Sequence, residues 1–191
     1  MKPILFNGEM VRAILEGRKT QTRRVVKPQP ECSVFDEPQL HWVCGKNGVW
    51  ADGHGNQQKA PLGQPGDRLY VRETWALFGP FNNGPGYRYR ADGEPLCMSR
   101  GWRPSIHMPK EAARIFLEIT AVRVERLQDI SEEDAKAEGC ELVGWTEEMP
   151  MPAGFAGLWN SLNGKRGHSW ESNPWVWVYE FTPTNNQGEG L

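Results

Sequence analysis

One stretch, residues 14–26, constrains the fold of this chain more than any other, because an apolar helix pattern gives way there to a run of cations. Four apolar side chains at helical spacing lead into it: Met10, Val11, Ile14 and Leu15. Asn7 is placed to cap the first free amides of this helix, and Gly17 is placed to end it. The cations therefore begin at the C-terminal end of a helix, where the carbonyl dipoles favour positive charge without any ligand.

The cationic run predicts a strand with two chemically different faces. Between Arg18 and Lys27 the chain carries five cationic side chains, with two threonines and two valines among them. Alternation gives one face to Thr20, Thr22, Arg24 and Val26, and the other to Lys19, Gln21, Arg23 and Val25. Lys19 and Thr22 are three residues apart, so their side chains converge only if Lys19 lies on the turn before the strand becomes regular.

Further elements follow from periodicity. Period-two alternation predicts strands over residues 68–75, 113–125 and 175–181. Ser131, followed three residues later by Asp134, predicts a helix N-terminus, and residues 154–163 carry an apolar helical stripe. The aromatic side chains at alternate positions of 175–181 favour core packing over a base-stacking platform. Glu138 lies at the C-terminal end of its helix, where the dipole disfavours a carboxylate, so a cationic partner is expected.

Two segments rich in proline and glycine, 28–65 and 76–103, are expected to be long loop insertions, with a strand-like island at 87–90. The first holds four residues of metal-binding type, Cys32, His41, Cys44 and His54. Only His41 and Cys44 have the close spacing that zinc sites use, so scattered loop residues are favoured and no metal site is predicted.

Four separated motifs resemble, in order, the ASCH domains of the PUA-like superfamily. They are the run 14–24, then Gly66-Asp67-Arg68-Leu69-Tyr70-Val71, then 117–122, then 130–139. The long form with its Trp-rich end looks most like ASCH proteins carried by bacteriophages and prophages. The resemblance implies an α+β fold, a mixed PUA-like β-barrel with a few short flanking helices. The resemblance covers most of the chain except the inserts at roughly 30–62 and 76–100. A single domain is expected over 1–182, followed by a flexible tail at 183–191.

The resemblance also implies an activity. ASCH amidohydrolases remove the acetyl group from 4-acetylcytidine and related acylated cytidines, and the residues that match theirs are Lys19, Thr22 and Glu138. In that chemistry a lysine acts as base, a threonine as nucleophile and a glutamate as acid or base. Lys19 is a base only when neutral, which burial and the neighbouring arginines would favour by lowering its pKa. Neither a metal nor a cofactor is implied.

Other polar and aromatic side chains are candidates for substrate binding: Arg24, Glu73, Trp75, Trp102, Ser105 and His107. The proline-stiffened segment 102–109 has the composition of a rigid pocket wall on which a base stacks against Trp102. Structural roles are equally compatible with these residues. Glu73 is suited to a salt bridge with an arginine, Trp102 to covering the core, and His107 to pairing with a carbonyl.

Composition limits the partners. Lys and Arg number 22 against 24 acidic residues, so the net charge of −2 gives no global attraction to nucleic acid, and any such affinity rests on a local patch. Four cysteines, the absence of a leader-like start and the lack of a long apolar run favour a cytoplasmic protein that does not enter membranes. The expected partner is a nucleoside or RNA, and no protein partner is evident. A non-catalytic RNA-binding module and, less strongly, a ribonuclease remain alternatives to the amidohydrolase.

Overall fold

The computed structural model of the chain describes residues 1–29, 43–44, 49–51, 57–81, 84–93, 101–140 and 152–184. Its centre is a five-stranded sheet in the order β1-β6-β9-β10-β2. The strands are β1 (Lys2–Leu5), β2 (Gln21–Val25), β6 (Arg68–Arg72), β9 (Phe116–Arg126) and β10 (Trp175–Thr184). β1 pairs with β6 in parallel, and the other neighbours are antiparallel.

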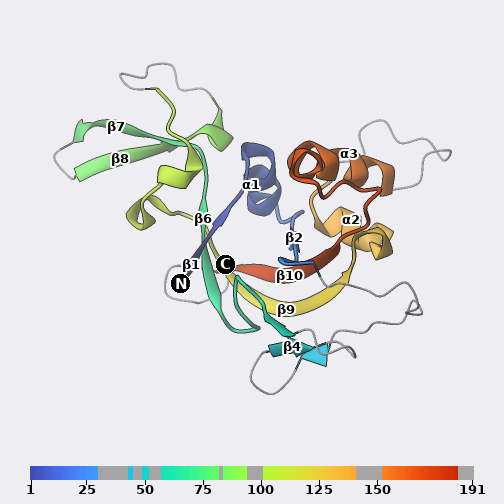
Figure 1. The fold of residues 1–191 in the computed structure, drawn as a ribbon. Helices are drawn as coiled ribbons and strands as arrows, with labels where there is room; N and C mark the ends of the chain where they lie inside the picture. Colours follow the sequence, from blue (N-terminus) through green and yellow to red (C-terminus); the bar gives the residue numbers. More distant parts are fainter. Residues whose placement is uncertain are drawn as a thin grey trace, which may run out of the picture.

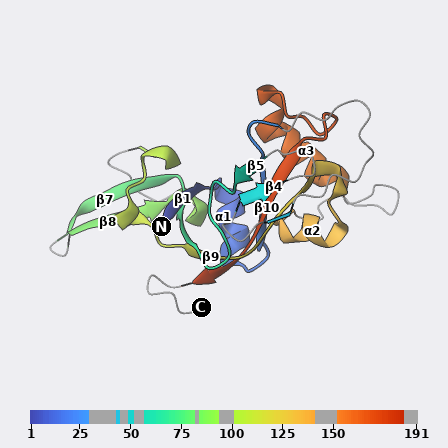
Figure 2. The same ribbon diagram turned by 60° about the horizontal axis from the view of Figure 1, so that its bottom comes forward.

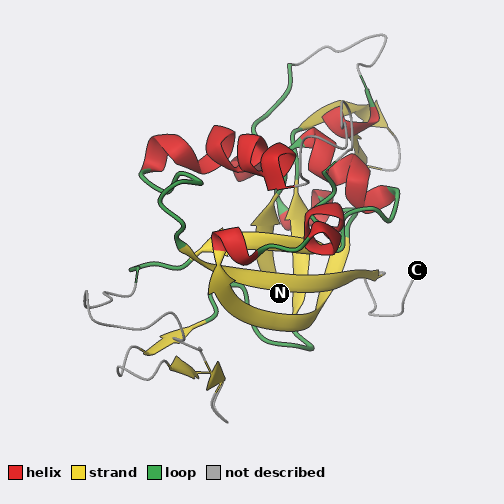
Figure 3. Cartoon of the chain, turned by 90° about the vertical axis from the view of Figure 1, so that its right-hand side faces the viewer, coloured by secondary structure: helices red, strands yellow, loops and turns green. Residues whose placement is uncertain are grey.

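The predicted α+β class is confirmed. The predicted closed barrel is not shown, because the strand pairs described form an open sheet with β1 and β2 as its edges. β9 and β10 are long and strongly curved (Figures 1 and 3), which brings the sheet toward a half-barrel. The two edges are bridged by a side chain, because the Arg24 guanidinium donates a hydrogen bond to the Leu5 carbonyl at 3.1 Å. Closure into a β-barrel by backbone pairing therefore stays a prediction.

Strand β10 divides its side chains between two cores. Trp175, Trp177, Tyr179 and Phe181 face the inner core, which also contains α1 and the apolar residues of β1, β6 and β9. Val176 and Val178 face the second core, where Phe155 and Trp159 of α3 cover the opposite side of the sheet. The aromatic stripe is thus core packing, as its spacing indicated. The strand runs to Thr184 and so includes the first two residues of the predicted tail, and residues 185–191 lie outside the described part.

Three helices flank the sheet: α1 (Gly8–Leu15), α2 (Glu132–Ala137) and α3 (Pro152–Asn163). Asn7 caps α1 by accepting from the Met10 amide at 2.8 Å, and Ser131 caps α2 by accepting from the Asp134 amide at 3.1 Å. Short 3-10 turns are η1 (Arg90–Asp92), η2 (Ser105–His107), η3 (Lys110–Ala112), η4 (Leu127–Asp129) and η5 (Gly164–Arg166). Among the described residues, no helix is both long and apolar enough to cross a bilayer.

The two expected insertions contain strands of their own. A small sheet joins β3 (Val43–Cys44), β4 (Val49–Ala51) and β5 (Gln57–Lys59). β7 (Trp75–Phe81) and β8 (Gly84–Tyr89) form a hairpin that projects from the body of the molecule (Figures 1 and 2). The predicted strand-like island at 87–90 corresponds to the end of β8, whereas loop composition missed β3, β4, β5 and most of β7. The structure does not describe the four residues of metal-binding type, Cys32, His41, His54 and the side chain of Cys44. The prediction that they form no zinc site is therefore not tested.

Candidate functional site

The end of α1 places Lys19 beside the C-terminus of α2. Gly17 adopts a positive φ of 72°, and the amides of Arg18 and Lys19 both donate to the Ala13 carbonyl, at 2.8 and 2.9 Å. This turn precedes β2, which is the position that convergence with Thr22 requires. Lys19 then forms an isolated antiparallel bridge with Glu138, the residue that ends α2.

The side chain of Lys19 is fully buried and uses every hydrogen of its ammonium group. Its Nζ donates to the Glu138 Oε2 at 2.7 Å, to the Glu138 carbonyl at 2.8 Å and to the Gln21 carbonyl at 2.8 Å. Burial lowers the pKa of Lys19, and Arg24 acts in the same direction, while Glu138 opposes the shift. The net direction favours a neutral amine more than in a solvated lysine.

Glu138 is held between two cations, as its place at a helix C-terminus indicated. Its Oε2 accepts from Lys19, and its Oε1 accepts from the Arg23 guanidinium at 3.3 Å. Arg23 is itself buried and also donates to Glu125 at 2.6 Å and to Asp134 at 2.7 Å. Among the described residues, the hydrogen-bond partners of the Arg23 side chain are carboxylates and Gln21, so Arg23 serves to fix Glu138 and α2 against β2.

Thr22 and Arg24 lie on the face of β2 that does not carry Arg23. In the sheet, Thr22 pairs with Tyr179 of β10 and Arg24 pairs with Trp177. Thr22 is 2% exposed, and its hydroxyl makes no hydrogen bond with any residue in the described part of the chain. It lines a hollow of about 20 Å³ together with Glu138, Arg23 and Arg24. A space of this size holds about one water molecule.

Arg24 is a half-buried cation that forms no salt bridge with a described carboxylate. Its guanidinium donates to the Leu5 carbonyl and stacks on the Phe6 ring, 5.4 Å from the ring centroid. Burial lowers the pKa of Arg24, against the attraction of Glu138 and Tyr179. Its charge is therefore only partly compensated within the protein.

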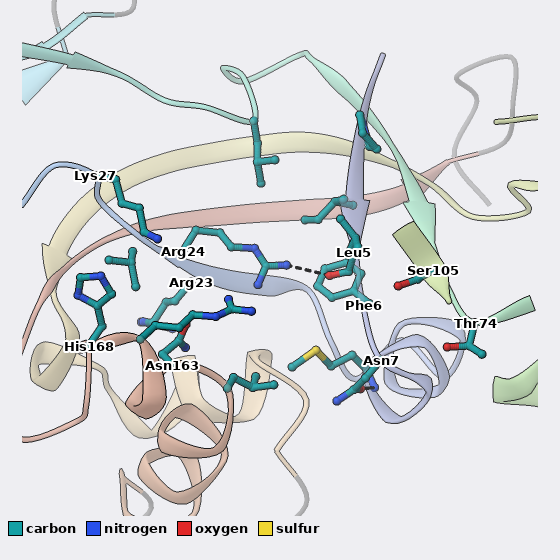
Figure 4. A pocket seen from close by; sticks show the side chains of 17 residues that line it. Leu5, Phe6, Asn7, Arg23, Arg24, Lys27, Thr74, Ser105, Asn163 and His168 are labelled. Carbon is teal, nitrogen blue, oxygen red and sulfur yellow. Dashed lines mark hydrogen bonds between the residues drawn. The ribbon is translucent and has the colours of Figure 1, made fainter. Parts of the chain in front are cut away.

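A larger cleft of about 650 Å³ opens between the two edge strands and shares five lining residues with the hollow: Met10, Arg23, Arg24, Leu162 and Asn163. Figure 4 shows Arg24 reaching across it from β2 toward Leu5, with Lys27 and His168 at one end and Thr74 and Ser105 at the other. Arg166 also lines it. Among the described residues, none that lines this cleft is acidic.

The structure brings together some of the residues that the sequence singled out and separates others. Lys19 pairs with Glu138, and Thr22 lines the same hollow as Glu138. Arg24 and Ser105 line the larger cleft, whereas Trp102 and His107 are not among its lining residues. Trp102 is half-buried and His107 is exposed.

Glu73, just before β7, and Trp75, its first residue, are buried and line neither the hollow nor the cleft. Glu73 accepts two hydrogen bonds from the Arg114 guanidinium, at 2.9 and 3.0 Å, although burial still raises the pKa of this carboxyl. Trp75 packs with Met108 and Ala112. The surroundings of Glu73 are thus the salt bridge with an arginine that was the alternative to substrate binding.

The residues that line the cleft but were not among the predicted binding residues include Lys27, Arg166 and His168. Lys27 belongs to the cationic run, and the other two come from the loop after α3, more than 130 residues later by numbering. The sequence signal was the basic character of residues 164–168, but nothing local showed that this loop reaches the edge of β2.

No protein-family model matches the chain, and no curated protein matches it significantly. The crystal structure of protein EF3133 from Enterococcus faecalis V583, assigned to the family DUF984, is similar with a TM-score of 0.46 and 10% sequence identity. The match covers 97% of this chain and 82% of that chain. A likeness of this size carries no argument about function, so membership of the ASCH family stays a prediction.

Proposed function

We propose that the protein is an amidohydrolase that removes an acyl group from the exocyclic nitrogen of a cytidine-like base. The observation that supports this most is the Lys19–Glu138 pair, with 2.7 Å between Nζ and Oε2, next to a hollow that Thr22 and Glu138 line together. A hydroxyl, a proton acceptor and a cleft of ligand size thus adjoin one another.

The proton acceptor is the Lys19–Glu138 pair acting as a unit. Lys19 has no exposed surface, whereas Glu138 lines the hollow, so a proton from Thr22 enters the pair through the carboxylate. When Lys19 is neutral and Glu138 is ionised, the pair can accept one proton. The hydrogen bond between Nζ and Oε2 then passes that proton from the carboxylate to the amine. The lowered pKa of Lys19 favours the competent state.

The reaction proceeds in two stages. The Thr22 oxygen bonds to the amide carbonyl carbon while its proton passes to the pair, and the C–N bond then breaks as the pair returns the proton to the departing nitrogen. Water next attacks the threonyl ester, which releases the carboxylic acid and restores the hydroxyl. Atoms and charges balance with water as the second reactant.

The test is whether the purified protein releases cytidine from N4-acetylcytidine. Chromatography measures the cytidine that is formed. Thr22→Val keeps the shape of the side chain but removes the hydroxyl, and should lower the rate by at least about 100-fold. Thr20→Val is the matched control, because Thr20 is exposed and two residues away, and it should leave the rate unchanged. Absence of turnover by the wild type, or equal rates in the two variants, would exclude this function.

A non-catalytic nucleotide- or RNA-binding module is the second candidate, and the cationic cleft favours it. Such a module grips phosphates, so its affinity for RNA falls steeply as salt rises. Titration of a short RNA at several salt concentrations checks this, and RNA affinity that does not change with salt would argue against a phosphate-gripping module.

A further inference from the structure

The larger cleft concentrates positive charge in a protein whose net charge is −2. Four of its lining residues are arginine or lysine, and His168 is a fifth that gains charge on protonation. Of the described residues that line it, none is aspartate or glutamate. A cleft with one sign of charge attracts ligands of the opposite sign.

The four cations are not equivalent. Arg23 is bonded to Glu125, Asp134 and Glu138, so its charge is already compensated. Arg24 has five N–H donors, and only one bond, to a neutral carbonyl, uses them within the described part of the chain. Lys27 and Arg166 are exposed and form no ion pair with a described residue.

A half-buried guanidinium with free donors is costly unless an anion approaches it. Planar guanidinium groups hold phosphate oxygens in pairs, and lysine adds a point charge. The cleft also offers apolar surface from Ile4, Leu5, Phe6 and Leu62, against which a base or sugar can pack. Cationic and apolar surfaces in one cleft suit a nucleotide better than a free nucleoside.

We propose that the substrate of this site carries a phosphate, which Arg24, Lys27 and Arg166 hold, so that the protein acts on acylated cytidine nucleotides rather than on the nucleoside. This inference rests on the proposed function, because the acyl group of the same ligand then has to reach the Thr22 hydroxyl from the larger cleft. Thr22 and Arg24 are two residues apart on one strand face, about 7 Å along the chain. Arg24 lines both spaces, so a ligand whose phosphate lies in the larger cleft can direct its reacting group toward the hollow at Thr22.

The experiment compares kcat/KM for N4-acetylcytidine, its 5′-monophosphate and a short RNA that contains one N4-acetylcytidine. The monophosphate should be turned over at least ten times more efficiently than the nucleoside. The double variant Lys27→Gln/Arg166→Gln should bring that ratio close to one, while Lys165→Gln, an exposed neighbour that does not line the cleft, should leave it unchanged. If the RNA is the better substrate, the bound phosphate belongs to a polynucleotide chain. If the monophosphate is the better substrate, the bound phosphate belongs to a free nucleotide.

Binding separates failure of this inference from failure of the proposed function. Calorimetry with cytidine and cytidine 5′-monophosphate needs no turnover. Tighter binding of the monophosphate that is lost in the double variant supports the phosphate site even if no substrate is hydrolysed. Equal affinities for the two ligands, or a phosphate preference that survives in the double variant, would overturn the inference whether or not hydrolysis occurs.

Discussion

The ammonium group of Lys19 and the carboxylate of Glu138 lie 2.7 Å apart in the interior, although 119 positions separate them in the chain. This pair ties the start of β2 to the end of α2. Removing one partner of a buried ion pair leaves an uncompensated charge, which typically costs about 3–5 kcal/mol. Lys19→Met should lower the free energy of unfolding by about 3 kcal/mol or more, measured by urea denaturation.

A double-mutant cycle isolates the pair from the two carbonyls that Lys19 also bonds. Glu138→Gln and Lys19→Met/Glu138→Gln complete the cycle, and a coupling energy above about 1 kcal/mol is expected for residues in one network. Lys136→Met is the control, because Lys136 is exposed on α2, and its change should stay below about 1 kcal/mol. Simple additivity of the two single variants would show that the pair makes no specific contribution.

The rate of the proposed hydrolysis should depend on pH through Lys19. Because only the neutral amine leaves the pair able to accept a proton, kcat/KM should rise with pH and level off below the ordinary lysine pKa of 10.5, since burial lowers the pKa of Lys19. A pH–rate profile with N4-acetylcytidine measures this. Lys19→Arg should abolish turnover at every pH, because a guanidinium does not deprotonate in this range. A rate that falls as pH rises would contradict the role of Lys19.

Much of the fold was predictable because local sequence determined it. Asn7, Gly17 and Ser131 marked helix ends, and strict alternation marked β9 and β10. The expected cationic partner for Glu138 is also present, because a carboxylate at a helix C-terminus needs compensation wherever the helix packs.

The rest depended on contacts between distant segments. β7 and β8 are stabilised by pairing with each other, and their glycine and proline content pointed to a loop everywhere except the predicted strand-like island at 87–90. The burial of Glu73 against Arg114 and the approach of Arg166 to the edge of β2 depend on how loops pack, which no local pattern encodes. The placement of Arg24 across two edge strands likewise follows from the curvature of the whole sheet.

Tyr179 should make the protein sensitive to high pH. Its hydroxyl accepts from the Leu62 amide at 3.2 Å, and burial raises the pKa of Tyr179 to about 12 from 10.0. The folded state therefore holds this proton more tightly, so the stabilisation is complete below pH 10 and is lost as pH rises toward 12. A shift of about two pKa units corresponds to about 3 kcal/mol.

Ultraviolet difference spectroscopy across pH 9–13 should show one of the four tyrosines titrating last, together with a fall in unfolding free energy. Tyr179→Phe should remove the last tyrosine titration and make the unfolding free energy less dependent on pH. At neutral pH the lost hydrogen bond should cost about 1 kcal/mol. Titration of all four tyrosines in a single step near pH 10 would refute the assignment.

Gly139 is the residue whose backbone conformation lets Lys19 and Glu138 meet. It has a positive φ of 79°, and a Cβ built there would lie 2.9 Å from the Ala13 Cβ and 3.0 Å from the Lys19 Cβ. Gly139→Ala therefore adds a collision with the lysine to the ordinary strain of a left-handed residue. Gly167 offers a matched control, since it has the same φ of 79° and a Cβ there would meet nothing within 4 Å.

Gly167→Ala should cost only the backbone strain, about 1–2 kcal/mol. Gly139→Ala should cost at least about 1 kcal/mol more, because Lys19 or α1 has to shift to admit the methyl group. If the pair is the proton acceptor, the same shift should also lower kcat for N4-acetylcytidine, whereas Gly167→Ala should leave kcat unchanged at a temperature where both variants are folded. If the two variants lose the same stability, the contact between Gly139 and Lys19 does not fix the position of the lysine. The close packing at this end of α2 would then not contribute to the proposed hydrolysis.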